Sequence, residues 1–176
     1  VVIQPCDFII ENKGNIRDFY RIGKIIGSGT FADVRLGINK STGAQRAIKV
    51  INKNRFNPDQ EKILRNEVKL HKNLDHPNIV KMFEYFRDEN RYYMITEICS
   101  GGELWQKIKK HTRFQESMVK YYMKQILKVT NYMHCKNVVH RDLKPENIVI
   151  SMTERGHIKL VDFGFAKRLS NLAQRT

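Results

Sequence analysis

Hydrophobic and polar residues alternate with the period of β-strands over the first third of the chain. Between residues 20 and 51 this alternation predicts three strands, separated by a glycine-rich turn and by a second turn at 41–43. A helix is predicted next, with Asn57 as its N-cap and Pro58 as its first residue, and it ends before residues 75–77. Two further short strands are expected near residues 79–86 and 92–96.

The pattern becomes helical after the glycine pair at 101–102. From 115 to 135 apolar residues recur at three- and four-residue spacing, which predicts an amphipathic helix. The residues expected on its apolar face are Val119, Tyr122, Met123, Ile126, Thr130 and Met133. Short strands are expected near 148–150 and 157–161. The sequence therefore predicts an α+β chain, in which five strands and one helix precede a mainly helical part, with the join near 98–102.

Composition and charge narrow the classes of function. The 176 residues include 32 Lys and Arg against 18 Asp and Glu, a net charge of +14. The basic residues are spread along the chain, which favours solvated faces over a nucleic-acid-binding surface. No apolar stretch approaches the roughly 18 residues of a membrane span, so no membrane-spanning segment is expected. Three widely spaced cysteines favour a reducing, cytoplasmic compartment. A zinc site at His134, Cys135 and His140 is disfavoured, because their spacing matches no standard ligand pattern.

A glycine-rich turn and a lysine inside a strand are the first candidates for phosphate chemistry. The turn at 27–30 allows backbone N–H groups to approach phosphate oxygens, and the strand after it predicts a hairpin flap over a nucleotide. Lys49 lies in an apolar strand, where its ammonium either snorkels to the surface or pairs with phosphates and a carboxylate. Glu67, on the apolar face of the next helix, is the better partner, and Glu61, near the helix start, is the alternative.

A second group of polar residues follows the long helix, at 140–147. Asp142 could accept a proton from a hydroxyl, Lys144 could neutralise a phosphoryl group, and Asn147 offers an oxygen to a hard cation. Asp162, in the Asp-Phe-Gly sequence at 162–164, is a second oxygen ligand. Each of these residues alone also fits an ordinary polar loop.

Taken together, the motifs match the signature set of protein kinases. The set is a glycine turn, an Ala-Ile-Lys strand, a His-Arg-Asp loop with Asn five residues after the Asp, and Asp-Phe-Gly. From about residue 20 onward the chain resembles a eukaryotic serine/threonine protein kinase domain, because Lys-Pro-Glu-Asn at 144–147 is the serine/threonine form of the loop. Within the family it is most similar to the calcium/calmodulin-related group, and there to the calcium-dependent protein kinases. The segments that carry this similarity are 14–20, 74–79 and 101–104.

The resemblance implies a bilobal fold. Residues 1–19 would be an N-terminal extension. Residues 20–98 would be the N-lobe, with a five-stranded antiparallel sheet and one helix. Residues 99–176 would be the first part of a mainly helical C-lobe, up to the start of the activation segment. Because the chain starts without Met and ends early in that segment, a truncated piece of a kinase is expected, with any regulatory region outside it.

The resemblance also implies ATP and Mg²⁺ as cofactors. Lys49, paired with Glu67, would contact the α- and β-phosphates. Asp142 would be the catalytic base that orients the substrate hydroxyl, and Lys144 would approach the γ-phosphate. The magnesium ions would be held by Asn147 and Asp162. Further nucleotide contacts are implied for Gly27, Ser28, Gly29, Thr30, Val34, Ala47, the gatekeeper Thr96, the hinge residues Glu97 and Cys99, Glu103 and Glu146.

Some implications concern substrates and departures from the family pattern. Glu103 and Glu146 match positions that bind a substrate arginine in basophilic kinases, so protein substrates with Ser or Thr near Arg are expected. Ala32 replaces the third glycine of the flap, and His71 stands where the family usually has an apolar residue. The alternative function is a non-catalytic, kinase-like fragment that binds a nucleotide or a partner.

Overall fold

The computed structural model describes residues 10–12, 14–29, 32–55, 57–110, 113–151 and 156–169. These residues belong to two compact units. Unit 1 comprises Val1–Asn73 and Lys81–Ile98, and unit 2 comprises Leu74–Val80 and Cys99–Thr176.

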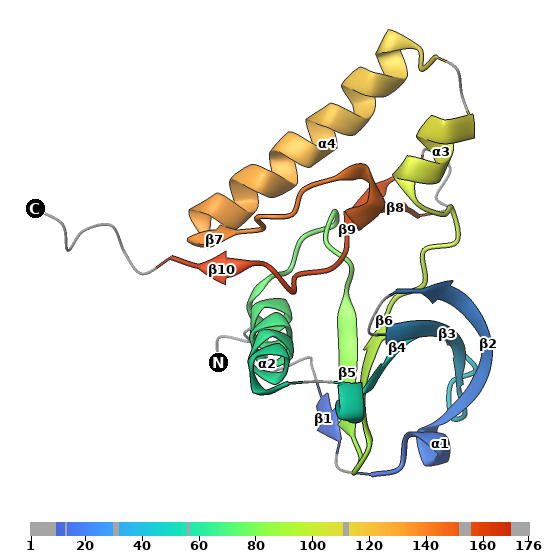
Figure 1. Cartoon of the computed structure of the whole chain (residues 1–176). Coiled ribbons are helices and arrows are strands. Elements are labelled where there is room, and N and C mark those ends of the chain that lie inside the picture. Colours follow the sequence, from blue (N-terminus) through green and yellow to red (C-terminus); the bar gives the residue numbers. More distant parts are fainter. Residues whose placement is uncertain are drawn as a thin grey trace, which may run out of the picture. The chain divides into compact units, whose positions relative to one another are not determined.

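Unit 1 is built on a six-stranded sheet in the order β1-β5-β6-β4-β3-β2 (Figure 1). The strands are β1 (Ile10–Asn12), β2 (Tyr20–Ser28), β3 (Ala32–Asn39), β4 (Gln45–Asn52), β5 (Met82–Arg87) and β6 (Arg91–Thr96). Strands β2 to β6 pair antiparallel, as the sequence predicts. Strand β1 pairs parallel with β5 and adds a sixth strand at the edge, within the stretch expected as an extension. Three residues are too few for alternation to reveal a strand.

Helices accompany the sheet. They are α1 (Ile16–Phe19), the 3₁₀ turn η2 (Lys53–Arg55) and α2 (Pro58–Asn73). The backbone N–H of Gln60 donates to Asn57 Oδ1, and the N–H of Asn57 donates to Gln60 Oε1, both at 2.9 Å. This reciprocal capping satisfies two backbone donors that the helix leaves unpaired, and it confirms Asn57 as the predicted N-cap of α2.

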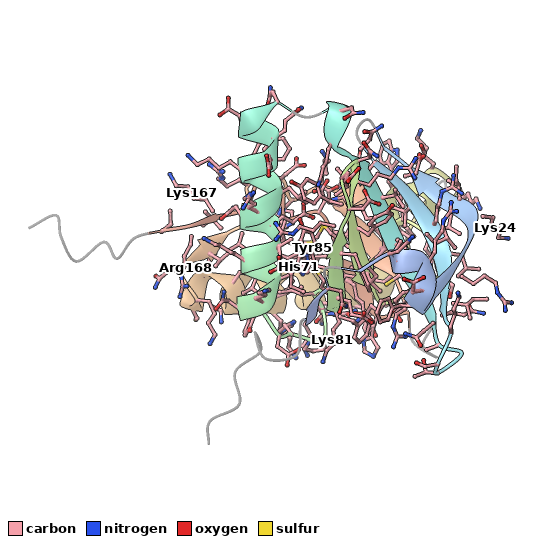
Figure 2. The ribbon with its side chains drawn as sticks, turned by 90° about the horizontal axis from the view of Figure 1, so that it is seen from below. Lys24, His71, Lys81, Tyr85, Lys167 and Arg168 are labelled. Carbon is pink, nitrogen blue, oxygen red and sulfur yellow. The ribbon has the colours of Figure 1, made fainter. Side chains whose placement is uncertain are left out.

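Side chains from the two faces of the sheet form two hydrophobic cores. The core beneath α2 consists of Ile51, Leu64, Val68, Met82, Tyr85, Tyr92 and Met94. The core on the opposite face, with α1, consists of Ile16, Tyr20, Ile48, Phe86, Tyr93 and Ile95. Figure 2 shows Tyr85 together with His71, a buried residue of α2, in the layer between that helix and the strands. Because strand residues alternate between two buried faces, the central strands are fixed in position and register.

Unit 2 combines two helices with short strand pairs (Figure 1). Its elements are α3 (Leu104–Lys110), α4 (Glu116–Cys135), β7 (Val138–Val139), η3 (Pro145–Asn147), β8 (Ile148–Ile150), β9 (Ile158–Leu160) and β10 (Lys167–Arg168). Strands β8 and β9 form an antiparallel hairpin, and β7 pairs antiparallel with β10. Among the described helices none combines the length and apolar character that a membrane crossing requires.

The predicted apolar face of α4 is buried in part and exposed in part. The residues of α4 that are buried are Tyr122, Gln125, Val129 and Met133. Val119 and Met123, which belong to the same predicted apolar face, have exposed fractions of 44% and 45%. The helix carries two apolar stripes, and the inward one includes a polar glutamine. Periodicity favours whichever stripe is more continuously apolar, so it cannot identify a stripe that contains Gln125.

The segment Leu74–Val80 is attached to unit 2 by hydrogen bonds. The Asn78 side-chain amide donates to Gln125 Oε1 at 2.9 Å and to the Ile158 carbonyl at 2.8 Å. The Val80 N–H donates to the Leu160 carbonyl at 3.0 Å. These bonds connect the segment to α4 and β9, although in sequence it lies between α2 and β5 of unit 1.

Candidate functional site

One face of the unit 1 sheet carries four of the residues singled out in the sequence. Val34 on β3 is paired with Lys49 on β4, and Ala47 on β4 is paired with Thr96 on β6. Partners in register share a face, and residues two apart on a strand do as well. Val34, Ala47, Lys49 and Thr96 therefore lie on the same side of the sheet.

Lys49 forms an ion pair with Glu67 of α2. Its Nζ lies 3.0 Å from Glu67 Oε1, and the two side chains are 30% and 6% exposed. Glu61, the alternative partner, instead accepts hydrogen bonds from Tyr92 Oη at 2.7 Å and from Arg65 at 2.8 Å. These two bonds, that from Tyr92 first, lower the pKa of Glu61. The structure thus selects the carboxylate on the buried side of the helix as the partner that orients the lysine.

The glycine turn closes the β2–β3 hairpin. Gly27 is paired with Val34, and Ser28 is paired with Asp33. The Gly29 N–H donates to the Ala32 carbonyl at 2.8 Å, and Ser28 Oγ donates to Asp33 Oδ1 at 2.6 Å. The sequence prediction of a turn between two strands is confirmed. Thr30, a predicted contact residue, lies outside the described residues.

The end of β6 is fixed by a reciprocal contact with the residue before β5. The Glu97 N–H donates to the Lys81 carbonyl at 2.9 Å, and the Lys81 N–H donates to Glu97 Oε1 at 2.7 Å. Glu97 is in unit 1 and half-buried, and Cys99, also half-buried, begins the second stretch of unit 2. Of these two predicted hinge residues, Glu97 is therefore fixed within unit 1 by its contacts with Lys81.

In unit 2, a buried histidine supports the polar loop that follows β7. The His140 ring is 2% exposed, and its Nε2 lies 3.3 Å from the Val161 carbonyl. The ring also packs edge-on against Phe163, with 5.0 Å between centroids. Burial lowers the pKa of His140. A neutral ring with its proton on Nε2 satisfies the Val161 carbonyl and joins the 140–147 loop to the Asp-Phe-Gly segment.

Two residues of these segments adopt left-handed backbone conformations. Arg141 has φ 66° and Asp162 has φ 60°. Arg141 Nε donates to the Phe165 carbonyl at 2.6 Å, which ties the first segment to the second. Non-glycine residues are uncommon in this region of conformational space, and such strain gathers at functional sites. The sequence showed no sign of it.

Three predicted residues meet around one carboxylate. Asp142 Oδ2 lies 2.8 Å from Lys144 Nζ and accepts a hydrogen bond of 2.8 Å from Asn147 Nδ2, which also donates to the Asp142 carbonyl at 3.0 Å. The hydrogen bond from Lys144, with that from Asn147, lowers the pKa of Asp142, and the same Lys144 bond raises the pKa of the lysine. Asp142 is therefore an ionised acceptor with a fixed orientation at neutral pH.

The β8–β9 hairpin brings two oxygen donors to the same end of unit 2. Ile148 is paired with Leu160, and the Val161 N–H donates to the Asn147 carbonyl at 3.0 Å. Asn147 therefore immediately precedes one strand, and Asp162 follows the other by two residues. Both side-chain hydrogen bonds described for Asn147 use its nitrogen, which leaves its amide oxygen for a cation. An amide oxygen and a carboxylate are ligands that suit a hard divalent cation.

The remaining predicted residues are less strongly anchored. Glu103, half-buried, forms an isolated bridge with Val149, and Glu146 is exposed in η3. Sequence reasoning missed Gln125 and Asn78, which hold this end of unit 2 together. A signal in the sequence was the position of Gln125, which lies at helical spacing from the buried apolar residues Tyr122, Val129 and Met133 of α4.

Comparison with known proteins finds a family match and relatives that agree with each other. Residues 20–176 match the protein kinase domain family. The chain is 40% identical over 165 residues to calcium-dependent protein kinase 5 of Plasmodium berghei (strain Anka), and 40% identical over 167 residues to the kinase of that name from Plasmodium falciparum (isolate 3D7). It is 43% identical over 168 residues to calcium-dependent protein kinase 4 of Plasmodium falciparum. These alignments cover 93–94% of this chain but only 29–32% of the relatives' lengths.

Proposed function

The chain belongs to the protein kinase domain family, and from that premise we propose that it transfers the γ-phosphate of ATP to serine or threonine hydroxyls of proteins. The observation that carries this proposal is the Asp142 carboxylate, fixed by Lys144 and Asn147 in the described geometry. In the proposed reaction Asp142 accepts a hydrogen bond from the substrate hydroxyl and aligns its oxygen for attack.

The lowered pKa of Asp142 determines what kind of base it is. A carboxylate stabilised by Lys144 is ionised at neutral pH but weakly basic. It is therefore suited to orienting a hydroxyl and to taking its proton late, when the oxygen has already begun to form its new bond. Lys144, which carries a positive charge beside Asp142, is proposed to neutralise the transferred phosphoryl group.

The residues fit the cofactors that the family uses. Asn147 and Asp162 offer the oxygen ligands that Mg²⁺ prefers, and the Lys49 ammonium, held by Glu67, suits phosphate oxygens. Magnesium, when bound, neutralises charge on the triphosphate. The further contacts proposed for the nucleotide are made by Gly27, Ser28, Gly29, Thr30, Val34, Ala47, Thr96, Glu97, Cys99, Glu103 and Glu146.

Four wider assignments accompany this function. Residues 1–19 are proposed as an extension, 20–98 as the N-lobe and 99–176 as the first part of the C-lobe. The exposed carboxylate of Glu146, with Glu103, supports substrates that carry Arg near the target Ser or Thr. The greater length of the relatives supports a regulatory region outside this chain, and the sparse cysteines support a cytoplasmic location.

A thermal melt with and without Mg·ATP tests the nucleotide site. At a ligand concentration about a hundred times its Kd, binding to the folded chain stabilises it by about 2.7 kcal/mol. We expect Mg·ATP to raise the melting temperature of the wild-type chain and of Asp75→Asn, an exposed aspartate of unit 2, but not of Asp162→Asn. A melt indifferent to Mg·ATP in all three proteins would contradict the nucleotide site.

Phosphate transfer to peptides tests the reaction and its substrate. We expect radioactive phosphate from labelled ATP to appear on a serine peptide containing arginine, and to be lost with Asp142→Asn. Equal incorporation by the wild-type chain and Asp142→Asn would contradict the role of Asp142. Preference for an acidic peptide without arginine would contradict the substrate assignment alone.

A further inference from the structure

A cavity of about 860 Å³ lies within unit 1, lined by residues of α1, β2, β3, β4 and β6 and of the turns beside them. Small-molecule sites have volumes of roughly 300–1,000 Å³, so a compact ligand fits a space of this size. Among the described residues its lining includes one carboxylate, Asp33, and five cationic side chains: Arg17, Arg21, Arg35, Lys40 and Arg91. We call this feature the basic pocket.

The basic pocket uses the face of the sheet that Lys49 does not. Asp33 on β3 is paired with Val50 on β4, which is paired with Tyr93 on β6, and all three line the pocket. Lys49 is next to Val50 in sequence and is paired with Val34. Because successive strand residues point to opposite faces, Asp33, Val50 and Tyr93 lie on the side of the sheet opposite to the proposed phosphate-binding lysine. The lining also includes Ala32, which is on the lysine's side, and Gly29, which is one of the proposed nucleotide contacts. A ligand held by the cations of the basic pocket would therefore be a second ligand, and competition with a nucleoside tests whether the two sites are separate.

The cations around the pocket form no ion pair with a carboxylate in the described part of the chain, since none of the five lies within 4.0 Å of one. Among the described residues, Arg35 donates a hydrogen bond to the Gly23 carbonyl at 3.3 Å. Asp33 is engaged by the Ser28 hydroxyl at 2.6 Å. Asp88 accepts hydrogen bonds of 2.7 Å from Tyr93 Oη and from the Arg91 N–H. Burial opposes the shift, but the bond from Tyr93 and, among further causes, the charge of Arg91 lower the pKa of Asp88. Asp88 thus compensates Arg91 in part, although it forms no ion pair with that guanidinium.

This arrangement favours an anion with several charges. Four arginines and a lysine around one concavity repel each other, and a ligand that bridges them removes that repulsion as it binds. Guanidinium groups form bidentate hydrogen bonds with phosphate oxygens, and their charge does not depend on pH in the physiological range. We propose that the basic pocket binds a compact anion that carries several phosphate groups, either as a free small molecule or as a lipid headgroup.

Calorimetry with inositol hexakisphosphate, in Mg²⁺-free buffer, tests the proposal. The test variant is Arg21→Gln/Arg91→Gln, which removes two exposed cations of the lining, one on β2 and one on β6. The matched control is Lys24→Gln/Lys62→Gln, which removes two exposed cations of unit 1 that do not line the pocket; Figure 2 shows Lys24 at the outer side of β2. A hydrogen bond between charged groups is worth about tenfold to hundredfold in affinity, so we expect the test variant to bind at least about tenfold more weakly.

Specific binding and general attraction to a basic protein predict different results. If the basic pocket is the site, the control binds within about twofold of the wild-type chain at 0.15 M salt, where exposed charges beyond about 8 Å are screened. Equal weakening in both variants, or no weakening in either, would overturn the proposal. Circular dichroism melts of both variants establish that each is folded, and Arg17→Gln provides a second pocket variant, expected to weaken binding as well.

Two further measurements show where the probe binds and whether the bound anion is a free molecule or a lipid headgroup. Saturating adenosine, which has no phosphate, is expected to leave the affinity for inositol hexakisphosphate unchanged; displacement would place the probe at the nucleotide residues and overturn the proposal. Vesicles of phosphatidylcholine with phosphatidylinositol 4,5-bisphosphate distinguish a lipid headgroup from a free polyphosphate as the ligand. Sedimentation with these vesicles, lost in Arg21→Gln/Arg91→Gln, supports the pocket as a headgroup site. Binding of the soluble probe without sedimentation supports it as a site for a free polyphosphate.

Discussion

Glu61 and Glu67 are on the same helix, yet they have different environments. Glu67 is 5% exposed and faces Lys49, whereas the Glu61 side chain is 39% exposed and pairs with Arg65, four residues along α2. An exposed i,i+4 pair contributes little to stability because water and salt screen it. Loss of one partner of a mostly buried pair costs more, because the other partner keeps its charge in a poorly solvated place.

Glu67→Gln and Glu61→Gln therefore form a matched test at the residue scale. We expect Glu67→Gln to lower the free energy of unfolding by about 1–3 kcal/mol, a range reduced from that of fully buried pairs because Lys49 is 30% exposed. Glu61→Gln should cost clearly less than Glu67→Gln, since a glutamine at this position can still accept a hydrogen bond from Tyr92. Urea denaturation followed by circular dichroism measures both, and equal costs would contradict the assignment of Glu67 as the buried partner.

Single residues differ in how far their surroundings could be predicted. Glu67 could be chosen over Glu61 because helical periodicity alone puts it beside apolar residues. The contact of Lys144 with Asp142 could not, because it depends on a loop in which Arg141 has φ 66°. No local sequence rule specifies a left-handed arginine, which is held there by its bond to the Phe165 carbonyl, far along the chain.

At the scale of elements, α4 is positioned by a polar contact as well as by its apolar stripe. Gln125 Oε1 accepts hydrogen bonds from Asn78 Nδ2 at 2.9 Å and from the Ile158 N–H at 3.1 Å. A single amide oxygen thus connects α4 to the segment Leu74–Val80 and to β9. Because β9 leads directly to Asp162, this contact also supports the candidate site.

Gln125→Leu removes that acceptor while keeping much of the side-chain volume. Two buried donors lose a partner, and each unsatisfied donor costs about 1–3 kcal/mol, so we expect a loss of about 2–4 kcal/mol in the free energy of unfolding. The control is Gln106→Leu, an exposed glutamine of α3, which should change stability by less than about 0.5 kcal/mol. Urea denaturation compares them, and a cost for Gln125→Leu no larger than for the control would show that α4 is held by its apolar stripe alone.

Elements with long, regular patterns were predictable, and short or polar ones were not. Strands β2 to β6 and helix α2 follow from periods of two and about four residues. Strand β1 has three residues, and its parallel pairing with β5 depends on tertiary contact rather than on its own pattern. The sequence pattern did not identify Gln125 as a buried residue of α4, because its burial depends on hydrogen-bond partners at Asn78 and on β9 that are far away in the sequence.

At the scale of the whole molecule, unit 2 holds two histidines whose pKa is lowered. Burial lowers the pKa of His140, and burial and then the charge of Lys128 lower the pKa of His76. His76 Nδ1 accepts a hydrogen bond of 3.0 Å from the Asn78 N–H, which requires an unprotonated nitrogen. His140 Nε2 lies 3.3 Å from the Val161 carbonyl, and its neighbour Phe163 leaves the ring little water. Both rings are therefore neutral in the folded chain at pH 7.

Unit 2 should consequently lose stability as the pH falls. The unfolded chain protonates each histidine near its ordinary pKa of about 6.5, and the folded chain does so only at lower pH, so the unfolded state binds more protons below that value. The stabilising effect is complete above about pH 6.5 and is lost as the pH falls through the folded value, by at most about 1.4 kcal/mol per pH unit for each histidine. Urea denaturation between pH 7.5 and 5.5 measures this slope. We expect His140→Gln and His76→Gln each to reduce it. If both variants kept the wild-type slope, neutral buried histidines would not be what makes the fold sensitive to acid.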